Sequence, residues 1–155
     1  MEAAKATSAK KPYIYCASLA ILFTLLLDTG AVAGWLTSTY YSFVQIADGN
    51  LVTIAIAKYD SRKSCEKGAK NLWIGARTTC PTCKLEESVC SPSLPPAFMD
   101  IYENKSRVFP YVDTGTTKLI YTGVPIDQGN LICDEVAAGM AKQLHRPVRC
   151  IRGSM

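Results

Sequence analysis

The cysteine content constrains the fold of this chain more than any other feature. Six of the seven cysteines follow an apolar N-terminal segment; they are Cys65, Cys80, Cys83, Cys90, Cys133 and Cys150. An even number of cysteines in an oxidising compartment predicts disulfide bonds, whereas the same residues in a reducing compartment more often bind a metal or act in catalysis. The compartment therefore decides which kind of fold to expect.

The N-terminus has the pattern of a segment that enters a membrane. Lys5, Lys10 and Lys11 precede an apolar run at residues 13–27, and small residues follow at positions 31–33. A basic region, an apolar stretch and a small-residue exit are together typical of a secretory signal. A buried core helix fits poorly, because the run is apolar on every face.

Two outcomes stay open for this segment: cleavage near Ala33, or retention as a membrane anchor. A spanning helix needs roughly 20 residues, a length that residues 12–33 supply. Asp28 opposes retention, and the neighbouring leucines and isoleucine offset its cost. In both outcomes the lysines keep the N-terminus in the cytoplasm, so the rest of the chain lies outside it. We therefore expect a signal or anchor segment with one hydrophobic helix at residues 1–36, and an extracytoplasmic domain at residues 37–155.

Separation along the chain favours one pairing near the C-terminus. Cys133 and Cys150 flank one predicted helix and strand, far from the other cysteines, so we expect them to form a bond. Closing a loop of about 15 residues stabilises a fold by roughly 3 kcal/mol in the chain-entropy model. We therefore expect the cysteines to have a structural role.

The four cysteines at residues 65–90 leave two arrangements open. We prefer Cys65–Cys90 together with Cys80–Cys83; the alternative joins Cys65 to Cys80 and Cys83 to Cys90. The same four thiolates could hold zinc. Such a site usually combines two C-x-x-C turns, and this chain has one. We therefore expect no metal and no cofactor.

Hydrophobic patterning predicts the first half of the fold. Residues 43–46 and 51–57 have strand patterns on either side of an Ala-Asp-Gly-Asn turn. The second of these strands is apolar enough to be central and buried. A helix is expected at residues 61–72, where Asp60 or Ser61 can cap it.

The second half of the sequence predicts a strand, a hairpin, a helix and a last strand. Prolines at residues 91–96 break regular structure, and residues 97–103 fit either a short helix or a strand. The predicted elements are a short strand or half-turn at 84–90, a hairpin of residues 107–112 and 118–123, a helix at 126–144 capped by Asp127, and a strand at 148–151.

These elements indicate the α+β class. We expect a small disulfide-stapled sandwich in which two helices pack on one mostly antiparallel sheet, preceded by the N-terminal hydrophobic helix. A ferredoxin-like arrangement is the nearest simple topology. No internal repeat is visible in the sequence.

The motif that most suggests catalysis is Cys80-Pro81-Thr82-Cys83. A C-x-x-C pair can cycle between dithiol and disulfide when a helix N-terminus lowers the pKa of its first thiol. A thioredoxin-like enzyme needs a long helix after the motif, and the segment between Cys83 and Pro92 is too short for one. We interpret the motif as a structural staple and keep an exported thiol–disulfide oxidoreductase that uses Cys80 and Cys83 as the alternative.

The other ionisable residues do not converge on a catalytic site. His145 is the one histidine and lies at the predicted end of the last helix, where a cation is favoured. Glu86/Glu87 and Asp134/Glu135 are adjacent in sequence, so the side chains within each pair diverge. We therefore expect no catalytic residues.

The charge balance does not favour nucleic acid as a partner. The formal net charge is +4, and no platform of interleaved aromatic and basic residues accompanies it. A basic C-terminal tail could contact lipid phosphates or an acidic protein surface. The tail consists of Arg146, Arg149 and Arg152, while Lys63, Lys67 and Lys70 are interpreted as the solvated face of the first helix.

Taken together, these features predict a non-enzymatic, disulfide-stabilised module outside the cytoplasm, membrane-anchored or secreted. The expected role is that of an accessory or structural subunit of a membrane or envelope assembly. It would contact the membrane through the N-terminal helix and bind one or more protein partners. A small-ligand or glycan-binding domain is a further alternative.

Overall fold

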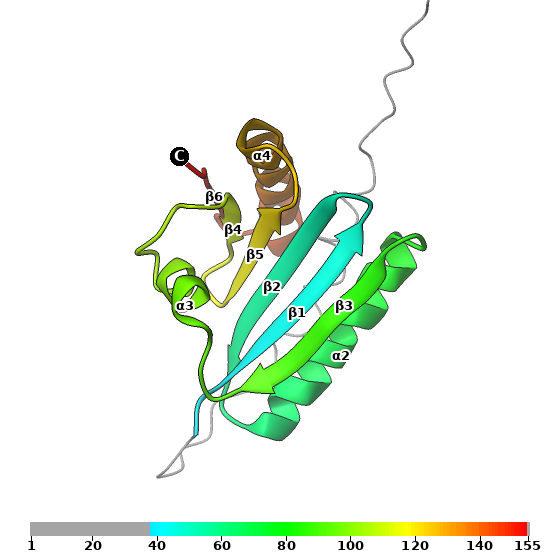
Figure 1. Ribbon diagram of the computed structural model, residues 1–155, viewed down its shortest axis with the longest axis vertical. Coiled ribbons are helices and arrows are strands. Elements are labelled where there is room, and N and C mark those ends of the chain that lie inside the picture. Colours follow the sequence, from blue (N-terminus) through cyan, green and yellow to red (C-terminus); the bar gives the residue numbers. More distant parts are fainter. Residues whose placement is uncertain (1–37, 155) are drawn as a thin grey trace, which may run out of the picture.

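The computed structural model describes residues 38–154, in which a six-stranded antiparallel sheet carries three helices (Figure 1). The expected α+β class and antiparallel sheet are therefore confirmed. The expected N-terminal helix at residues 1–36 lies outside the described residues. In chain order the elements are β1 (Tyr40–Asp48), β2 (Leu51–Tyr59), α2 (Arg62–Thr79), β3 (Lys84–Ser91), α3 (Pro96–Tyr102), β4 (Tyr111–Asp113), β5 (Thr117–Thr122), α4 (Ile126–Leu144) and β6 (Arg149–Ile151).

The two halves of the sheet repeat the same topology. The strands are arranged in the order β3-β1-β2-β5-β4-β6. In each half a hairpin leads into a helix, and a third strand returns to pair antiparallel with the first strand of that hairpin. The halves meet where β2 and β5 pair antiparallel. The structure thus contains an internal repeat, strand-strand-helix-strand, that the sequence did not reveal.

This order differs from the ferredoxin-like arrangement in its connections. A ferredoxin-like fold is built as β-α-β-β-α-β, whereas this chain follows β-β-α-β twice, with α3 between the repeats. A split β-α-β motif is nevertheless present in each half, because β1 lies between β2 and β3, and β4 lies between β5 and β6.

Local sequence explains the first hairpin. Asp48 pairs with Leu51, so the connection between β1 and β2 has two residues, Gly49 and Asn50. Gly49 has a φ of 62°, as a type II′ turn requires at its first central position. The Ala-Asp-Gly-Asn sequence therefore sets the register of the hairpin.

Both faces of the sheet are covered by helices. Helices α2 and α4 pack on one face, where Leu72 and Met140 join Val44 and Leu119 in one apolar cluster. On the other face α3 contributes Ile101 to a second cluster. Strand β2 has buried residues on both faces, which confirms the expectation of a central buried strand.

Several boundaries differ from the sequence expectations. Helix α2 continues to Thr79 rather than ending at Leu72, because Gly75 and Ala76 extend its buried face. Residues 96–102 form a helix, which settles the choice left open for that segment. Ser61 caps α2 by accepting a hydrogen bond from Ser64 N at 3.2 Å. Asp127 does not cap α4; Pro125 holds the N-cap position, and Asp127 lies in the first turn.

The described helices pack on the sheet and do not form membrane spans. Of the helices in residues 38–154, none combines the length and the apolar composition that crossing a bilayer requires.

Candidate functional site

Disulfide bonds join the helix of each half to its third strand. Cys65 on α2 is bonded to Cys90 on β3, and Cys133 on α4 is bonded to Cys150 on β6. Cys65 and Cys133 are completely buried. These pairs, and Cys80–Cys83 between them, form the connectivity that the sequence favoured. Each half therefore has its helix fixed to its sheet by a covalent bond within the core.

The helix cysteines also give the two halves a common register. Ala69 and Ala137 each follow the helix cysteine by four residues, and both are buried. Leu72 and Met140 each follow it by seven residues and are buried as well. The repeat is thus visible in the spacing of buried positions, although the residues themselves differ.

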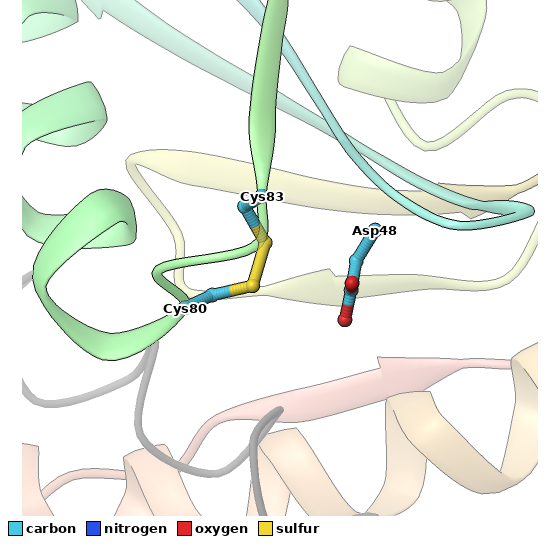
Figure 2. Close-up of side chains that lie close together, drawn as sticks. All are labelled: Asp48, Cys80 and Cys83. Carbon is cyan, nitrogen blue, oxygen red and sulfur yellow. A yellow bond between two sulfur atoms is a disulfide. The ribbon is translucent and has the colours of Figure 1, made fainter.

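The Cys80–Cys83 disulfide closes the turn between α2 and β3 (Figure 2). Cys80 is the C-cap of α2 and is buried, while Cys83 is partly exposed. The carboxylate of Asp48, from the end of β1, lies beside the two sulfurs, and Thr82 Oγ1 donates a hydrogen bond to Asp48 Oδ1 at 3.3 Å. The turn that the disulfide closes is therefore linked to the tip of the first hairpin by the hydrogen bond from Thr82 to Asp48.

This position is unfavourable for a reactive thiolate. The C-terminal end of a helix carries partial negative charge, and Asp48 adds a full one. Both oppose ionisation of a thiol released by reduction, whereas reactive C-x-x-C pairs have electropositive surroundings. The geometry thus favours a structural staple over the redox alternative for Cys80 and Cys83.

Within residues 38–154, Asp48, Cys80 and Cys83 are the residues whose side chains lie close enough together to share a metal ion. One ligand atom each from Asp48, Cys80 and Cys83 lies within 4.8 Å of the other two. Because the two sulfurs are bonded to each other, they offer no thiolate ligands in this state. Cys65 and Cys90 are bonded separately, so the structure does not assemble the four-cysteine zinc site considered above.

Two of the other residues considered from the sequence, Glu86 and Asp134, have structural partners. Glu86 accepts a hydrogen bond from Gln45 Nε2 at 2.5 Å. Asp134 lies 2.5 Å from Arg152 in an ion pair. His145 ends α4 in a left-handed conformation, with a φ of 49°, and is exposed.

The expected basic tail is therefore partly neutralised. Arg149 lies 3.5 Å from Asp113, and Arg152 is paired as described. The tail thus presents less free positive charge than the sequence implies.

A buried ion pair between Asp113 and Lys118 was not anticipated. Lys118 Nζ lies 2.7 Å from Asp113 Oδ2, and each side chain is 4% exposed. Lys118 Nζ and the Tyr111 hydroxyl both donate to Asn104 Oδ1, at 2.9 and 3.0 Å. The network ties the second hairpin to the segment that follows α3. Its sequence signal is the hairpin register, which places Asp113 directly opposite Lys118.

Opposing effects set the pKa of the Asp113 carboxyl. Burial raises it, but hydrogen bonds from Lys118 and from the Gly115 N–H, with the charges of Lys118 and Arg149, outweigh burial. The net pKa lies below the ordinary value. Asp113 is therefore held as a carboxylate in a structural pair.

An open groove runs between α2 and the edge strand β3, with a volume of about 500 Å³. Sequence reasoning missed it, since it depends on how the helix lies beside the strand. From α2 the groove is lined by Arg62, Glu66, Lys70 and Trp73, and from β3 by Leu85 and Val89. The groove thus combines apolar side chains with two cations and one carboxylate.

Comparisons of the chain with models of protein families, with curated proteins and with solved structures give no match.

Proposed function

We propose that this protein is a non-enzymatic interaction module that acts outside the cytoplasm, as an accessory or structural subunit of a membrane or envelope assembly. The module is either tethered by its N-terminal segment or released by cleavage near Ala33. No partner class is implied by relatives, so the proposal depends on the chemistry of the chain itself.

The observation that carries the proposal is the pairing of all six cysteines of the described domain. Bonds between Cys65 and Cys90 and between Cys133 and Cys150 lie at equivalent places in the two halves. Disulfides persist in oxidising compartments and are rare in the cytosol. This supports an extracytoplasmic location, and it agrees with the basic and apolar N-terminal sequence.

The contacts of the polar residues support an interaction role rather than catalysis. Within residues 38–154, the buried Asp113–Lys118 pair and the exposed Asp134–Arg152 pair both connect separate elements. The C-x-x-C bond lies at a helix C-terminus beside a carboxylate. In contrast, the groove along α2 and β3 is accessible, and it is the surface on which a partner could dock.

The test is the intact mass of the native protein, measured in membrane and soluble fractions before and after reduction. Three disulfides predict that six alkylated thiols appear only after reduction. The same spectra report whether the N-terminal segment is retained. Six free thiols, or a bound zinc ion, in cytosolic protein would contradict the proposal.

Reactivity separates the proposal from its enzymatic alternative. The module predicts that Cys80–Cys83 resists mild reduction and that the protein does not reduce an insulin disulfide. An accessible Cys83 thiolate at neutral pH, together with catalysed disulfide exchange, would favour the oxidoreductase instead.

A further inference from the structure

The second half of the domain places its own chain against α4. Gly153 donates its N–H to Asn130 Oδ1 at 2.9 Å, and Asn130 Nδ2 donates back to the Gly153 carbonyl at 3.4 Å. Arg152 Nη2 lies 2.5 Å from Asp134 Oδ2. Two polar side chains of α4 therefore bind the segment that follows β6: Asn130 binds its backbone at Gly153, and Asp134 pairs with its Arg152.

In the first half, the corresponding helix positions face an open groove. The two α4 side chains lie three residues before and one residue after Cys133; relative to Cys65 these positions are held by Arg62 and Glu66. Arg62 Nε and Glu66 Oε1 pair with each other at 2.9 Å, both are exposed, and both line the groove.

The path of the chain explains the difference between the halves. After β6 the chain continues along α4, but after β3 Pro92 and Pro95 direct it toward α3. Helix α3 packs on the opposite face of the sheet from α2. The first half has Pro92 and Ser93 at the positions that correspond to Arg152 and Gly153, and neither carries a charge that could replace the pairing of Arg62 with Glu66.

The groove also has the elements that bind an extended peptide. Strand β3 is an edge strand, so its outer backbone groups can pair with an added strand. Leu85 is 38% exposed, and Trp73 lines the same groove. Leu85 and Trp73 offer an apolar contact for a peptide side chain, whereas Val89 pairs with Phe43 on the face away from α2.

Only part of β3 is suited to strand addition. The register with β1 shifts between Gln45 and Ile46, which leaves a bulge at Glu86. Bulges and charged side chains protect sheet edges from unwanted pairing. Beyond the bulge, residues 87–91 pair regularly with β1. A bound segment would therefore lie along this second part of β3.

Charge indicates the composition of the segment. Helix α2 carries Lys63, Lys67 and Lys70 on its exposed side, and Lys70 also lines the groove. Glu66 is the acidic residue of α2, and Arg62 already pairs with it. Glu87 of β3 pairs with Gln45 and lies on the face away from α2, so carboxylates that point toward α2 would meet these cations, whereas carboxylates on the other face would meet Glu87.

We propose that the groove between α2 and β3 binds an extended segment of a partner protein, in which an apolar side chain has a carboxylate two residues before it and another two residues after it, on the same face of the strand. The apolar side chain contacts Trp73 and Leu85, these carboxylates approach Lys70, and the backbone pairs with residues 87–91 of β3. The inference rests on the proposed role as an interaction module and names the partner chemistry of that role.

The test measures binding of short fluorescent peptides to the full chain, purified with its disulfides intact. One peptide carries a leucine with a glutamate two residues before it and another two residues after it and serine at the alternate positions, and a matched peptide has lysine in place of glutamate. We expect the acidic peptide to bind and the basic peptide to bind at least tenfold more weakly. Methylation of alternate backbone amides of the acidic peptide is expected to abolish binding, because strand addition needs those N–H groups.

Variants locate the site. Lys70→Glu and Leu85→Glu are expected to weaken binding of the acidic peptide at least tenfold, which corresponds to about 1.4 kcal/mol. Lys142→Glu on α4 makes the same charge change at another exposed position and is expected to leave binding unchanged. A circular dichroism spectrum and a urea midpoint equal to those of the unchanged protein show that each variant is folded.

Several results would overturn the inference. They are equal binding of the two peptides, no binding of the acidic peptide, and equal effects of Lys70→Glu and Lys142→Glu. A dimer that Leu85→Glu dissociates would assign the groove to a second copy, and binding to phosphatidylglycerol vesicles that Lys70→Glu alone removes would assign it to lipid. Any of these results with intact disulfides contradicts the groove assignment alone, whereas free cysteines in the cytosol contradict the proposed function.

Discussion

Lys118 Nζ lies 2.7 Å from Asp113 Oδ2 in a pair whose side chains are each 4% exposed. The two residues face each other across the β4–β5 hairpin. A buried ion pair adds little to stability compared with well-packed apolar residues at the same two positions. Removing only one partner is nevertheless costly, because the other charge stays buried without an equivalent partner. The pair therefore makes the second hairpin sensitive to changes of a single charge.

Removing the Lys118 charge is expected to destabilise the domain strongly. The variant Lys118→Met leaves the Asp113 carboxylate with Gly115 N–H and the more distant Arg149. We expect the free energy of unfolding to fall by about 3 kcal/mol, measured by urea denaturation followed by circular dichroism.

Two further variants serve as controls for that measurement. Lys142→Met removes an exposed lysine and is expected to change stability by no more than about 0.5 kcal/mol. The double variant Asp113→Asn/Lys118→Met removes both charges, so it is expected to lose less than the sum of the single variants. Additive losses would show that the pair is not coupled.

Acid is expected to weaken the same pair. The pKa of Asp113 in the folded protein is lower than the ordinary value of an aspartate, because the effect of burial, which raises it, is outweighed by Lys118, Gly115 N–H and Arg149 together. Its contribution to stability is therefore complete above about pH 4 and is lost as the pH falls through the lower folded pKa. The urea midpoint should fall less between pH 7 and pH 3 in Asp113→Asn than in the unchanged protein. An equal fall in both proteins would mean that other carboxylates account for the acid sensitivity.

Sequence reasoning succeeded where the determinants are local. Cysteine separation indicated the observed pairs, and the Gly49-Asn50 turn fixed the first hairpin. It failed at the end of α2, where residues 73–79 include Gly75 and two threonines of low helix propensity. Packing of Gly75 and Ala76 against the sheet continues the helix there, and such tertiary contacts override propensity.

The repeat and the groove could not be predicted for a different reason. Both depend on how separate segments meet in space, and the two halves share the spacing of buried positions rather than their residues. The open groove follows from the route of the chain after β3, which turns at Pro92, compared with its route after β6. Neither route is encoded by a pattern within one element.

Loop length predicts which disulfide matters most for stability. The Cys65–Cys90 bond spans 25 residues, and the Cys80–Cys83 bond spans 3. In the chain-entropy model, replacing both cysteines by alanine is expected to cost about 3.5 kcal/mol for the long loop and about 1.6 kcal/mol for the short one.

The two double-alanine variants can be compared by thermal unfolding at equal protein concentration. Cys65→Ala/Cys90→Ala should have the lower midpoint, and Cys80→Ala/Cys83→Ala should remain folded with two disulfides. If the short bond proved the more important for stability, the turn between α2 and β3 would have an additional role that loop closure does not explain.

Gly68 in α2 is expected to be essential for packing, because the ring of Tyr59 occupies the space beside it. A Cβ at position 68 would lie 2.2 Å from the Tyr59 hydroxyl oxygen and 2.5 Å from the ring carbon that bears it. The clash is with the far end of the Tyr59 side chain, so the ring has to rotate away from its place beside α2 to admit the methyl group. We expect Gly68→Ala to lower the free energy of unfolding by about 1–3 kcal/mol, although alanine favours a helix.

Gly139 in α4 provides the matched control. A Cβ there meets nothing within 4 Å, so Gly139→Ala should stabilise the domain by roughly 0.5–1 kcal/mol through helix propensity alone. Urea denaturation of both variants separates packing from propensity, since the two changes are chemically identical. A gain in stability for Gly68→Ala would show that Tyr59 does not hold the position beside α2.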